Sequence, residues 1–203
     1  MQQFLKFLLD DEISPIKSEK QTFNKGQKLL LEDIDKTVNY VFGISEGIVA
    51  MNSDTVTIDF LGVNQFLGLY MNDELNLHGE ILSKTAVIWK FELTDVLAKV
   101  TSHKKGLLLY NKHVMDIQKN VTQKSNVMKL NNSNKVLLSL RTIASRFGEE
   151  LDSHDVVRIP AYFTRKVLSN YTNIKATTLT NVLNKLYSKD KILYGRRVIL
   201  VYI

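Results

Sequence analysis

The segment from Thr164 to Ile203, TRKVLSNYTNIKATTLTNVLNKLYSKDKILYGRRVILVYI, decides the fold. Thr164 is a good N-cap for a first helix whose apolar residues recur at helical spacing. Asn173 follows, and asparagine tolerates the left-handed conformation that a tight turn requires. A second apolar stripe, a polar tail and two short β-rich runs on either side of Gly195 complete the segment. This order predicts helix, turn, helix and a two-stranded wing, an arrangement that is typical of DNA-binding units.

The second helix of this segment has two different faces. Its apolar residues are expected to form core: Leu179, Val182, Leu183 and Leu186. The side chains between them are small or carry a hydroxyl or amide, so they can approach base edges in the major groove. We therefore predict a DNA-binding surface made by the cap of the first helix, the second helix and the wing. Its residues are Thr164, Lys175, Ala176, Thr177, Thr180, Asn181, Lys185, Arg196 and Arg197.

The net charge of +6 is concentrated at the C-terminal end of the chain. The stretch from Arg141 to Ile203 holds eleven Lys and Arg against five Asp and Glu, whereas the residues before it are balanced. Every arginine lies at Arg141 or later, and guanidinium is the better forked ligand for phosphate. The charge therefore favours binding of a polyanion by this end. The alternative is a solvated surface whose charge is unevenly distributed.

The composition bounds the class of protein. The chain has 203 residues, of which 44% are hydrophobic, so it can bury a core. It has no cysteine, which excludes disulfides, Cys-ligated clusters and a thiol nucleophile. We find no signal peptide and no apolar run near the roughly 20 residues that span a bilayer. We expect a soluble cytoplasmic protein without a membrane partner.

The sequence marks no enzyme site. The four histidines, His78, His103, His113 and His154, form no metal-binding pair at HxH or HExxH spacing. There is no phosphate-binding loop and no GxSxG nucleophile elbow. For His78 we favour an exposed loop residue over a haem ligand. We expect no catalytic residues and no metal.

The pattern of apolar residues changes twice in the region before the C-terminal segment. Residues 1–20 predict one or two short amphipathic helices, with Phe4, Leu5, Leu8 and Leu9 on one face. From Phe23 to about Phe91, short apolar runs separated by Gly, Asn and Asp predict a β-sandwich or barrel. After Thr94 the pattern becomes helical. A further helix is expected from an N-cap at Ser133 to a C-cap at Gly148, followed by a short strand that ends at Pro160.

A heptad pattern predicts one long helix with a narrow apolar seam. Lys124 interrupts the pattern. A narrow seam suits a second long helix, so we favour a symmetric homodimer over a surface helix packed on its own domain. The predicted dimerisation residues are Leu107, Tyr110, Val114, Ile117, Val121 and Met128.

The order of these elements resembles the Crp/Fnr superfamily of bacterial transcription regulators, and in particular its divergent members similar to the listerial regulator PrfA. The segments FNKGQKLLLE, YVFGISEGIVAM, FLGVNQFLG and TAVIWKFELTDVLAKV are similar to the strands and following helix of the family's N-terminal domain. The resemblance implies an α+β protein with a cyclic-nucleotide-binding-like β-roll (jelly roll) over 1–100, a dimerisation helix over 101–132 and a winged helix-turn-helix over 133–203. It also implies a double-stranded DNA operator and RNA polymerase as partners.

The chain departs from the family pattern at two places. The segment QFLGLYMNDELNLHGEILSKTA lacks the arginine that binds the cyclic phosphate in cAMP-binding members, and Lys84 is its nearest cation. Asp73, Glu74 and Glu80 would repel a phosphate, so we expect no cAMP, and without cysteine no iron–sulfur cluster. The family often reads its half-site with Arg, Glu and Arg, where this chain has Ala176, Thr177 and Asn181. We expect a palindromic, A·T-leaning operator with half-sites about one helical turn apart.

The role of the β-roll stays open between two alternatives. It senses an unknown small molecule, or it has lost its ligand. The candidate pocket residues, whose aromatic members fit structural core as well, are Phe66, Leu69, Tyr70, Lys84 and Trp89. The alternative function is a protein-interaction module with a degenerate nucleotide-binding-like roll and no specific DNA target. The basic charge of the wing favours DNA.

Overall fold

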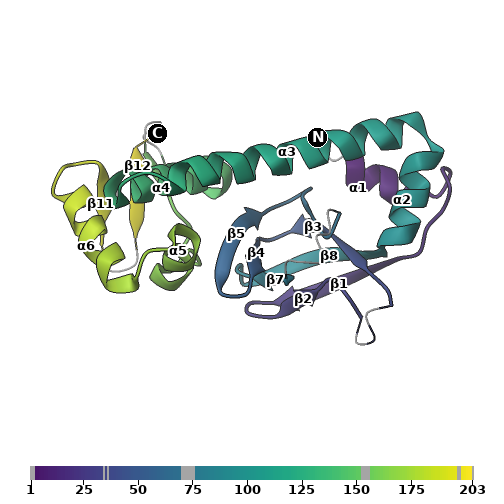
Figure 1. Ribbon diagram of the computed structural model, residues 1–203, viewed down its shortest axis with the longest axis horizontal. Helices are drawn as coiled ribbons and strands as arrows, with labels where there is room; N and C mark the ends of the chain where they lie inside the picture. The colour runs from purple at the N-terminus through teal and green to yellow at the C-terminus, as the bar shows by residue number, and fades with distance from the viewer. Residues whose placement is uncertain are drawn as a thin grey trace. The chain divides into compact units, whose positions relative to one another are not determined.

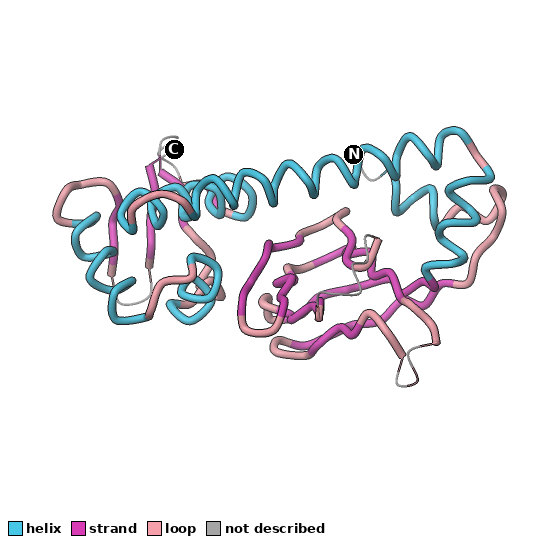
Figure 2. Tube along the Cα trace, viewed as in Figure 1, coloured by secondary structure: helices cyan, strands magenta, loops and turns pink. Residues whose placement is uncertain are grey.

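The computed structural model describes residues 3–33, 35, 37–69, 76–151, 156–195 and 198–202. Of the candidate site residues, Tyr70, Arg196 and Arg197 lie outside these ranges, as do Asp73, Glu74 and His154. The chain divides into two compact units, Met1–Asn120 and Val121–Ile203. Both units mix helices and strands, as Figures 1 and 2 show.

The first unit is a roll of two antiparallel sheets with three helices. One sheet has the strand order β1-β8-β3-β6 and the other β2-β7-β4-β5. The strands are β1 Ser18–Asn24, β2 Lys28–Leu30, β3 Tyr40–Glu46, β4 Val49–Ser53, β5 Val56–Leu61, β6 Phe66–Leu67, β7 Leu77–Ile81 and β8 Thr85–Glu92. The helices are α1 Gln3–Leu8, α2 Leu93–Ser102 and the first part of α3 Lys104–Met128. The predicted α+β class with an N-terminal β-roll is confirmed.

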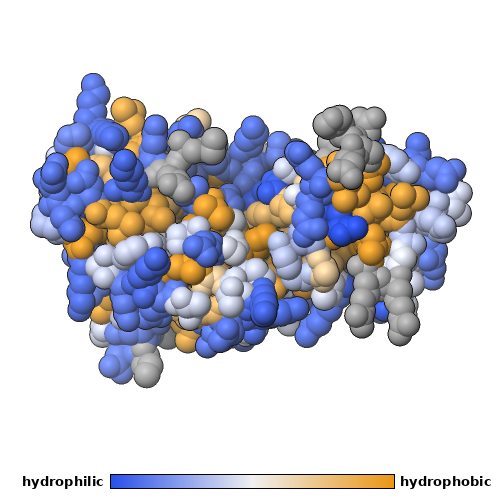
Figure 3. All heavy atoms as spheres, turned by 180° about the vertical axis from the view of Figure 1, so that it is seen from behind, coloured by the Kyte–Doolittle hydropathy of each residue, from blue (hydrophilic) through white to orange (hydrophobic). Residues whose placement is uncertain are grey.

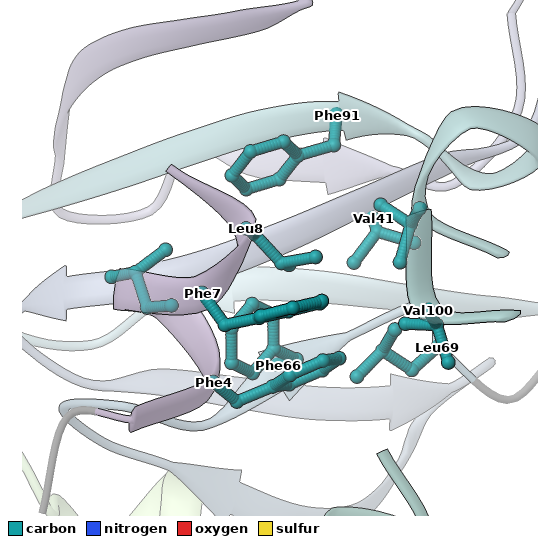
Figure 4. Packing of buried hydrophobic residues seen from close by; sticks show 10 residues of the cluster. Phe4, Phe7, Leu8, Val41, Phe66, Leu69, Phe91 and Val100 are labelled. Atoms are coloured by element: carbon teal, nitrogen blue, oxygen red, sulfur yellow. The ribbon is translucent and has the colours of Figure 1, made fainter. Parts of the chain in front are cut away.

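Two hydrophobic clusters form the core of the roll. The first lies between the two sheets, and its members alternate along the strands, as expected for strands with one buried face. It comprises Leu29, Leu31, Phe42, Ile44, Val49, Leu61, Leu67, Ile81, Ala86 and Ile88. The second joins α1 to α2 and to the roll, and we call it the aromatic cluster (Figure 4). It comprises Phe4, Leu5, Phe7, Leu8, Val41, Phe66, Leu69, Phe91, Val96 and Val100.

The prediction of one or two helices over residues 1–20 is right for α1 and wrong for the residues from Ser18 onward. Helix α1 ends at Leu8, and residues from Ser18 onward form β1, which pairs with β8 from Ser18↔Phe91 to Asn24↔Thr85. The roll therefore begins before Phe23. The polar stretch of β1 carries little apolar periodicity because the strand lies at the edge of its sheet and is largely exposed.

Lys99 anchors α1 from the neighbouring helix. Its side chain is only 1% exposed, and its Nζ donates hydrogen bonds to the carbonyl oxygens of Leu8 at 3.0 Å and Asp10 at 2.6 Å. These carbonyls lie at and just beyond the C-terminal end of α1, where a cation is favoured by the helix dipole. Burial lowers the pKa of Lys99, and the carboxylates of Asp10 and Asp11 oppose that change.

The long helix is confirmed as α3, which has no break between Lys104 and Met128. His103 separates it from α2, so the expected dimerisation segment 101–132 contains the end of α2 as well. The N-cap of the next helix is Asn131 instead of Ser133, because the Asn131 side chain accepts the backbone N–H of Asn134 at 3.0 Å. That helix, α4, spans Asn132–Phe147, and Gly148 is its C-cap as predicted.

The second unit contains the helix-turn-helix and its wing. Its sheet has the order β11-β12-β10-β9. Beyond the end of α3 and α4, its elements are β9 Glu149–Glu150, β10 Val156–Arg158, α5 Arg165–Thr172, α6 Ala176–Tyr187, β11 Ile192–Tyr194 and β12 Ile199–Tyr202. The four apolar residues predicted for the core of α6 are all buried. Strands β11 and β12 pair antiparallel as the predicted wing.

The turn between α5 and α6 depends on Asn173. Its φ of 52° and ψ of 43° place it in the left-handed region, as the sequence predicts. The turn is closed by backbone N–H groups of Asn173 and Ile174, which both donate to the carbonyl of Ser169. The Ser169 hydroxyl donates to the carbonyl of Ile174 at 2.6 Å. These bonds fix the direction in which α6 leaves the turn.

Hydrophobic side chains also reach the surface of both units. Figure 3 shows them as orange areas among hydrophilic blue ones. The most exposed are Met115, Leu30 and Leu108, at 67%, 62% and 61%. Within the described ranges, none of the helices combines the length and hydropathy of a membrane-spanning segment.

We predict that Lys99→Met lowers the free energy of unfolding of the roll by about 1–3 kcal/mol, because it leaves the carbonyls of Leu8 and Asp10 without their donor. The control is Lys6→Met, which removes an exposed amine from α1 and is expected to change stability little. Urea unfolding followed by the fluorescence of Trp89, the single tryptophan, reports on the roll. Equal stability of the two variants would contradict the anchoring role of Lys99.

We predict that Asn173→Ala destabilises the second unit by about 1 kcal/mol, because alanine disfavours the left-handed conformation. Asn173→Gly is the matched control, since glycine adopts this conformation without a Cβ clash. Thermal unfolding followed by circular dichroism should place the alanine variant below the glycine variant. The reverse order would show that the turn does not require a positive φ.

Candidate nucleic-acid interface

Helix α6 presents a polar, uncharged face at the surface. Thr177, Asn181 and Asn184 are exposed and follow one another at helical spacing. Opposite them, the buried leucines and Val182 pack into the unit. The two faces assigned to this helix from the sequence are therefore separated in the structure as expected.

The structure refines the set of residues on this face. Thr180 is half-buried, and its hydroxyl donates to the carbonyl of Ala176 at 2.9 Å, so its proton is already used within the helix. Asn184 was missed by the sequence reasoning, although it lies seven residues after Thr177 and three after Asn181. This spacing places Asn184 on the same helix face as Thr177 and Asn181, and it could have identified the residue from the sequence. Lys175, Ala176 and Lys185 are exposed at the ends and flank of the helix.

The stretch of sequence that contains this face has exposed cations and no carboxylate. Between Val156 and Lys189 there is no Asp or Glu. The basic residues of that stretch are all exposed: Arg158, Arg165, Lys166, Lys175, Lys185 and Lys189. Such a surface attracts polyanions, and the attraction weakens as salt increases.

The N-terminus of α5 opens onto a groove beside the wing. Thr164 caps the helix by accepting the N–H of Val167 at 3.4 Å, and the first amides of a helix have no acceptor within the helix. The groove measures about 290 Å³, and Thr164, Arg165, Tyr194 and Gly195 contribute to its lining. Helix N-termini with a neighbouring arginine are favourable positions for phosphate.

The wing hairpin is closed by a backbone hydrogen bond. The N–H of Gly195 donates to the carbonyl of Val198 at 2.9 Å. Arg196 and Arg197, which the sequence predicts as backbone contacts, fall between these two residues and outside the described ranges.

The predicted dimerisation residues are divided between two sides of α3. Leu107 and Val121 are exposed, at 46% and 39%, and Val114 lies between them at the same heptad position. Tyr110 instead packs against the aromatic cluster, and its hydroxyl donates to the carbonyl of Leu69 at 3.2 Å. Ile117 and Met128 are half-buried.

Lys124, which interrupts the heptad pattern, has a contact in the second unit. Its Nζ lies 4.4 Å from the centroid of the Tyr171 ring, on α5. Tyr171 is 4% exposed, so the lysine covers a buried aromatic ring of the helix-turn-helix. A cation over an aromatic face is an attractive arrangement. The contact links the last turns of α3 to α5.

Three of the four described candidate effector residues meet at the aromatic cluster, and Lys84 lies elsewhere. Phe66 and Leu69 are buried members of the aromatic cluster, and half-buried Trp89 packs against it. Lys84 is exposed between β7 and β8, where its carbonyl accepts the N–H of Lys25. His78 lies within β7 opposite Leu30 and Asn52, so it is a strand residue and not the loop residue expected.

No group of three or more His, Asp or Glu side chains is placed to hold a metal ion in the part of the chain that the structure describes.

Comparisons with known proteins place the fold. No protein-family model and no curated protein sequence matches the chain. Solved structures do match over nearly its whole length. A cyclic nucleotide-binding domain containing protein from Listeria monocytogenes EGD-e has a TM-score of 0.76 at 14% identity and covers 91% of this chain and 89% of its own. FixK2 from Bradyrhizobium japonicum has a TM-score of 0.72 at 12% identity, covering 92% and 93%.

A transcriptional regulator of the CRP/FNR family from Thermus thermophilus has a TM-score of 0.69 at 16% identity. It covers 91% of this chain and 94% of its own. The likeness therefore covers both compact units, including helix α3, which has a part in each unit. The chain has the fold of the Crp/Fnr transcription regulators, as its sequence resemblance implied.

Proposed function

We propose that the chain is a dimeric, sequence-specific DNA-binding transcription regulator. The observation that carries the proposal is the exposed, uncharged face of α6, set in a stretch with six exposed cations and no carboxylate. The fold shared with transcription regulators supports it. A regulator of this kind acts in the cytoplasm beside RNA polymerase, and we include both in the proposal. The chain has no catalytic role in it.

Base readout is assigned to Thr177, Asn181 and Asn184. In the major groove, asparagine pairs bidentately with adenine, and the threonine methyl packs against the methyl of thymine. Guanine is most often read by arginine or lysine, and the centre of this face has neither. An operator half-site that leans towards A·T follows from these side chains.

Phosphate contacts are assigned to the groups around that face. Arg165 and the free amides of α5 meet at the groove beside the wing, where a phosphate would receive both forked and backbone hydrogen bonds. Lys175 and Lys185 are exposed at the start and the flank of α6. Arg196 and Arg197 are retained as wing contacts from the sequence. Such contacts position the protein and supply affinity without discriminating bases.

Dimerisation is assigned to the exposed face of α3. Leu107, Val114, Val121 and Met128 alternate with Asn111, Gln118 and Ser125 at the spacing of a two-stranded coiled coil. All the members of this seam are uncharged, and the three polar residues are exposed. Buried Asn in such a seam specifies register and oligomeric state. A two-fold dimer of this kind binds a palindromic operator with half-sites about one helical turn apart.

The roll holds one side of α3 through the aromatic cluster and Tyr110. Whether it also binds a small molecule is a separate question from DNA binding, because the assigned DNA contacts all lie in the second unit.

We predict that Thr177→Ala, Asn181→Ala and Asn184→Ala each change the preference at one base-pair position by about 1–3 kcal/mol. Arg165→Ala is expected to weaken binding to all sequences together and to reduce the salt slope by about one phosphate contact. The DNA is first selected from a random pool with the wild-type protein. Affinities are then measured by fluorescence anisotropy at two salt concentrations.

The matched control is Lys28→Ala, which removes an exposed cation from β2 of the roll and should leave affinity unchanged. If the three α6 variants bind the selected DNA with unchanged affinity and preference, the major-groove assignment is wrong. If the wild-type protein shows no salt-sensitive binding to any DNA, a protein-interaction module is the better interpretation.

We predict that Leu107→Glu combined with Val121→Glu raises the dimer dissociation constant by more than about tenfold, because each buried aliphatic side chain contributes about 1.5–3 kcal/mol. Lys112→Glu combined with Lys119→Glu places the same carboxylates on another exposed side of α3 and serves as the control. Sedimentation velocity over a concentration series measures both. An unchanged dimer in the first variant would contradict the assigned seam.

A further inference from the structure

His113 of α3 is a half-buried titratable residue that packs against aromatic side chains. The centroid of its ring lies 5.2 Å from the ring centroid of Phe66, in an edge-on arrangement, and 6.2 Å from the ring centroid of Phe4. The ring centroids of Phe4 and Phe66 lie 5.0 Å apart, and Figure 4 shows these two side chains next to each other. The Nε2 of His113 is buried, and no hydrogen-bond partner for it exists among the described residues. A buried polar atom without a partner needs a physical explanation.

The neutral form of the ring explains this arrangement. In a neutral ring whose proton is on Nδ1, Nε2 is a bare lone pair that needs no acceptor. Protonation would place a charged N–H at Nε2, where nothing accepts it, and burying such a group is costly. Burial accordingly lowers the pKa of His113, and the Asp116 carboxylate and the Phe66 hydrogen bond only partly oppose this.

Helix α1 depends on the cluster in which His113 lies. It has six residues, too few to form a stable helix alone in water. Phe4, in its first turn, contacts Phe66, Tyr110 and His113, whereas its last turn is held by the two hydrogen bonds from Lys99. The two ends of α1 are therefore held by different interactions.

We infer that His113 operates a latch, in which its protonation frees the first turn of α1 from the aromatic cluster while Lys99 keeps the last turn in place. The neutral imidazole packs against the rings of Phe4 and Phe66. The imidazolium needs a hydrogen-bond acceptor or water at the buried Nε2, and it gains one when Phe4 moves away. The segment that moves is the beginning of α1, and the hinge lies at Leu8.

The charged and titratable groups around His113 belong to α3, to α1 and to the residues packed beyond α1. On α3 they are Asp116 and the Tyr110 hydroxyl, which is bonded to Leu69. On α1 the charged residue is Lys6, which is exposed. Beyond α1, Lys99 and His103 lie near the ring of Phe7, at 5.7 and 6.3 Å from its centroid. The described residues of β6 and its flanks, from Asn64 to Leu69, contribute none.

The sign of the pH dependence follows from the lowered pKa. The open form binds a proton near the ordinary histidine value of about 6.5, and the closed form binds it only at lower pH. The latch is therefore fully closed above about pH 6.5, and acidification opens it. The ratio of open to closed forms rises by up to about tenfold for each pH unit below that value, until the closed form also protonates.

The test is hydrogen exchange of the full-length protein between pH 7.5 and 5.5, with protection factors corrected for intrinsic exchange. In the wild type, protection of the Phe7 and Leu8 amides should fall by up to about tenfold per pH unit below 6.5. Amides of Ile44 and Ile88 in the roll and of Leu183 in α6 report global unfolding and should change less. The ¹³C-edited NMR titration of His113 should give a midpoint below 6.5.

His113→Phe keeps a ring in the cluster and removes the titration, so protection of Phe7 and Leu8 should no longer depend on pH. His113→Gln is the second non-titrating variant, for the case in which the first does not fold. His103→Gln is the matched control, because it removes an exposed histidine near Phe7 and should retain the pH dependence. A midpoint at or above 6.5, or an unchanged pH dependence in both His113 variants, would overturn the latch. The measurement uses no DNA, so its outcome is independent of the proposed function.

Discussion

The close approach of α1 to α3 at Gly106 fixes the rotation of the long helix. Gly106 is the buried residue of α3, and a Cβ at this position would lie 2.5 Å from Cζ of Phe7 and 3.0 Å from the carbonyl oxygen of Val100. Any larger side chain would force the helices apart. Once Gly106 faces inward, helical geometry turns Tyr110 and His113 to the same side, because they follow one and two turns later. The inward side of α3 is thereby determined.

The outward side is determined by the same constraint. A residue next to Gly106 in sequence lies about 100° around the helix, so Leu107 is turned off the inward side and is 46% exposed. Leu107 and Val121 remain exposed although they are aliphatic, Val114 and Met128 are half-buried, and Asn111, Gln118 and Ser125 are uncharged. In the proposed dimer, the packing of Gly106 against Phe7 therefore sets the rotation of Leu107, and a substitution at Gly106 would disturb both sides of this part of α3.

The sequence predicted which segments form helices and strands better than it predicted which face of each helix packs against the chain. The heptad repeat predicted α3 because apolar residues at that spacing require a helix. It could not tell which heptad positions face the chain's own roll, because Tyr110 fits a dimer seam and a core equally well. The Asn-rich stretch before α4 offered several caps, so the choice of Ser133 failed. His113 carried no sequence signal, since its neighbours Phe4 and Phe66 are far from it along the chain.

For the candidate interface, the sequence identified the scaffold and most of the exposed residues. The turn at Asn173, the cap at Thr164 and the inward leucines follow local rules that packing does not override. The hydroxyl of Thr180 bonds back to the helix, which depends on its rotamer and could not be predicted from the residue type, and its DNA contact stays a prediction. The assignment of Arg196 and Arg197 as wing contacts to DNA rests on the sequence alone.

The distribution of charge on the second unit separates affinity from discrimination. Arginine in a recognition helix supplies both, since it binds guanine and also attracts phosphate wherever the helix lies along DNA. Here Thr177, Asn181 and Asn184 are neutral, and the exposed cations lie elsewhere in the same stretch of sequence. Under the proposed function, non-specific attraction comes from those cations, while the amides and methyl groups of α6 contribute only where base edges match them. Because each such contact would be modest, two half-sites read by two copies would supply the selectivity, and the proposal therefore joins the neutral α6 face and the uncharged seam of α3 in one mechanism.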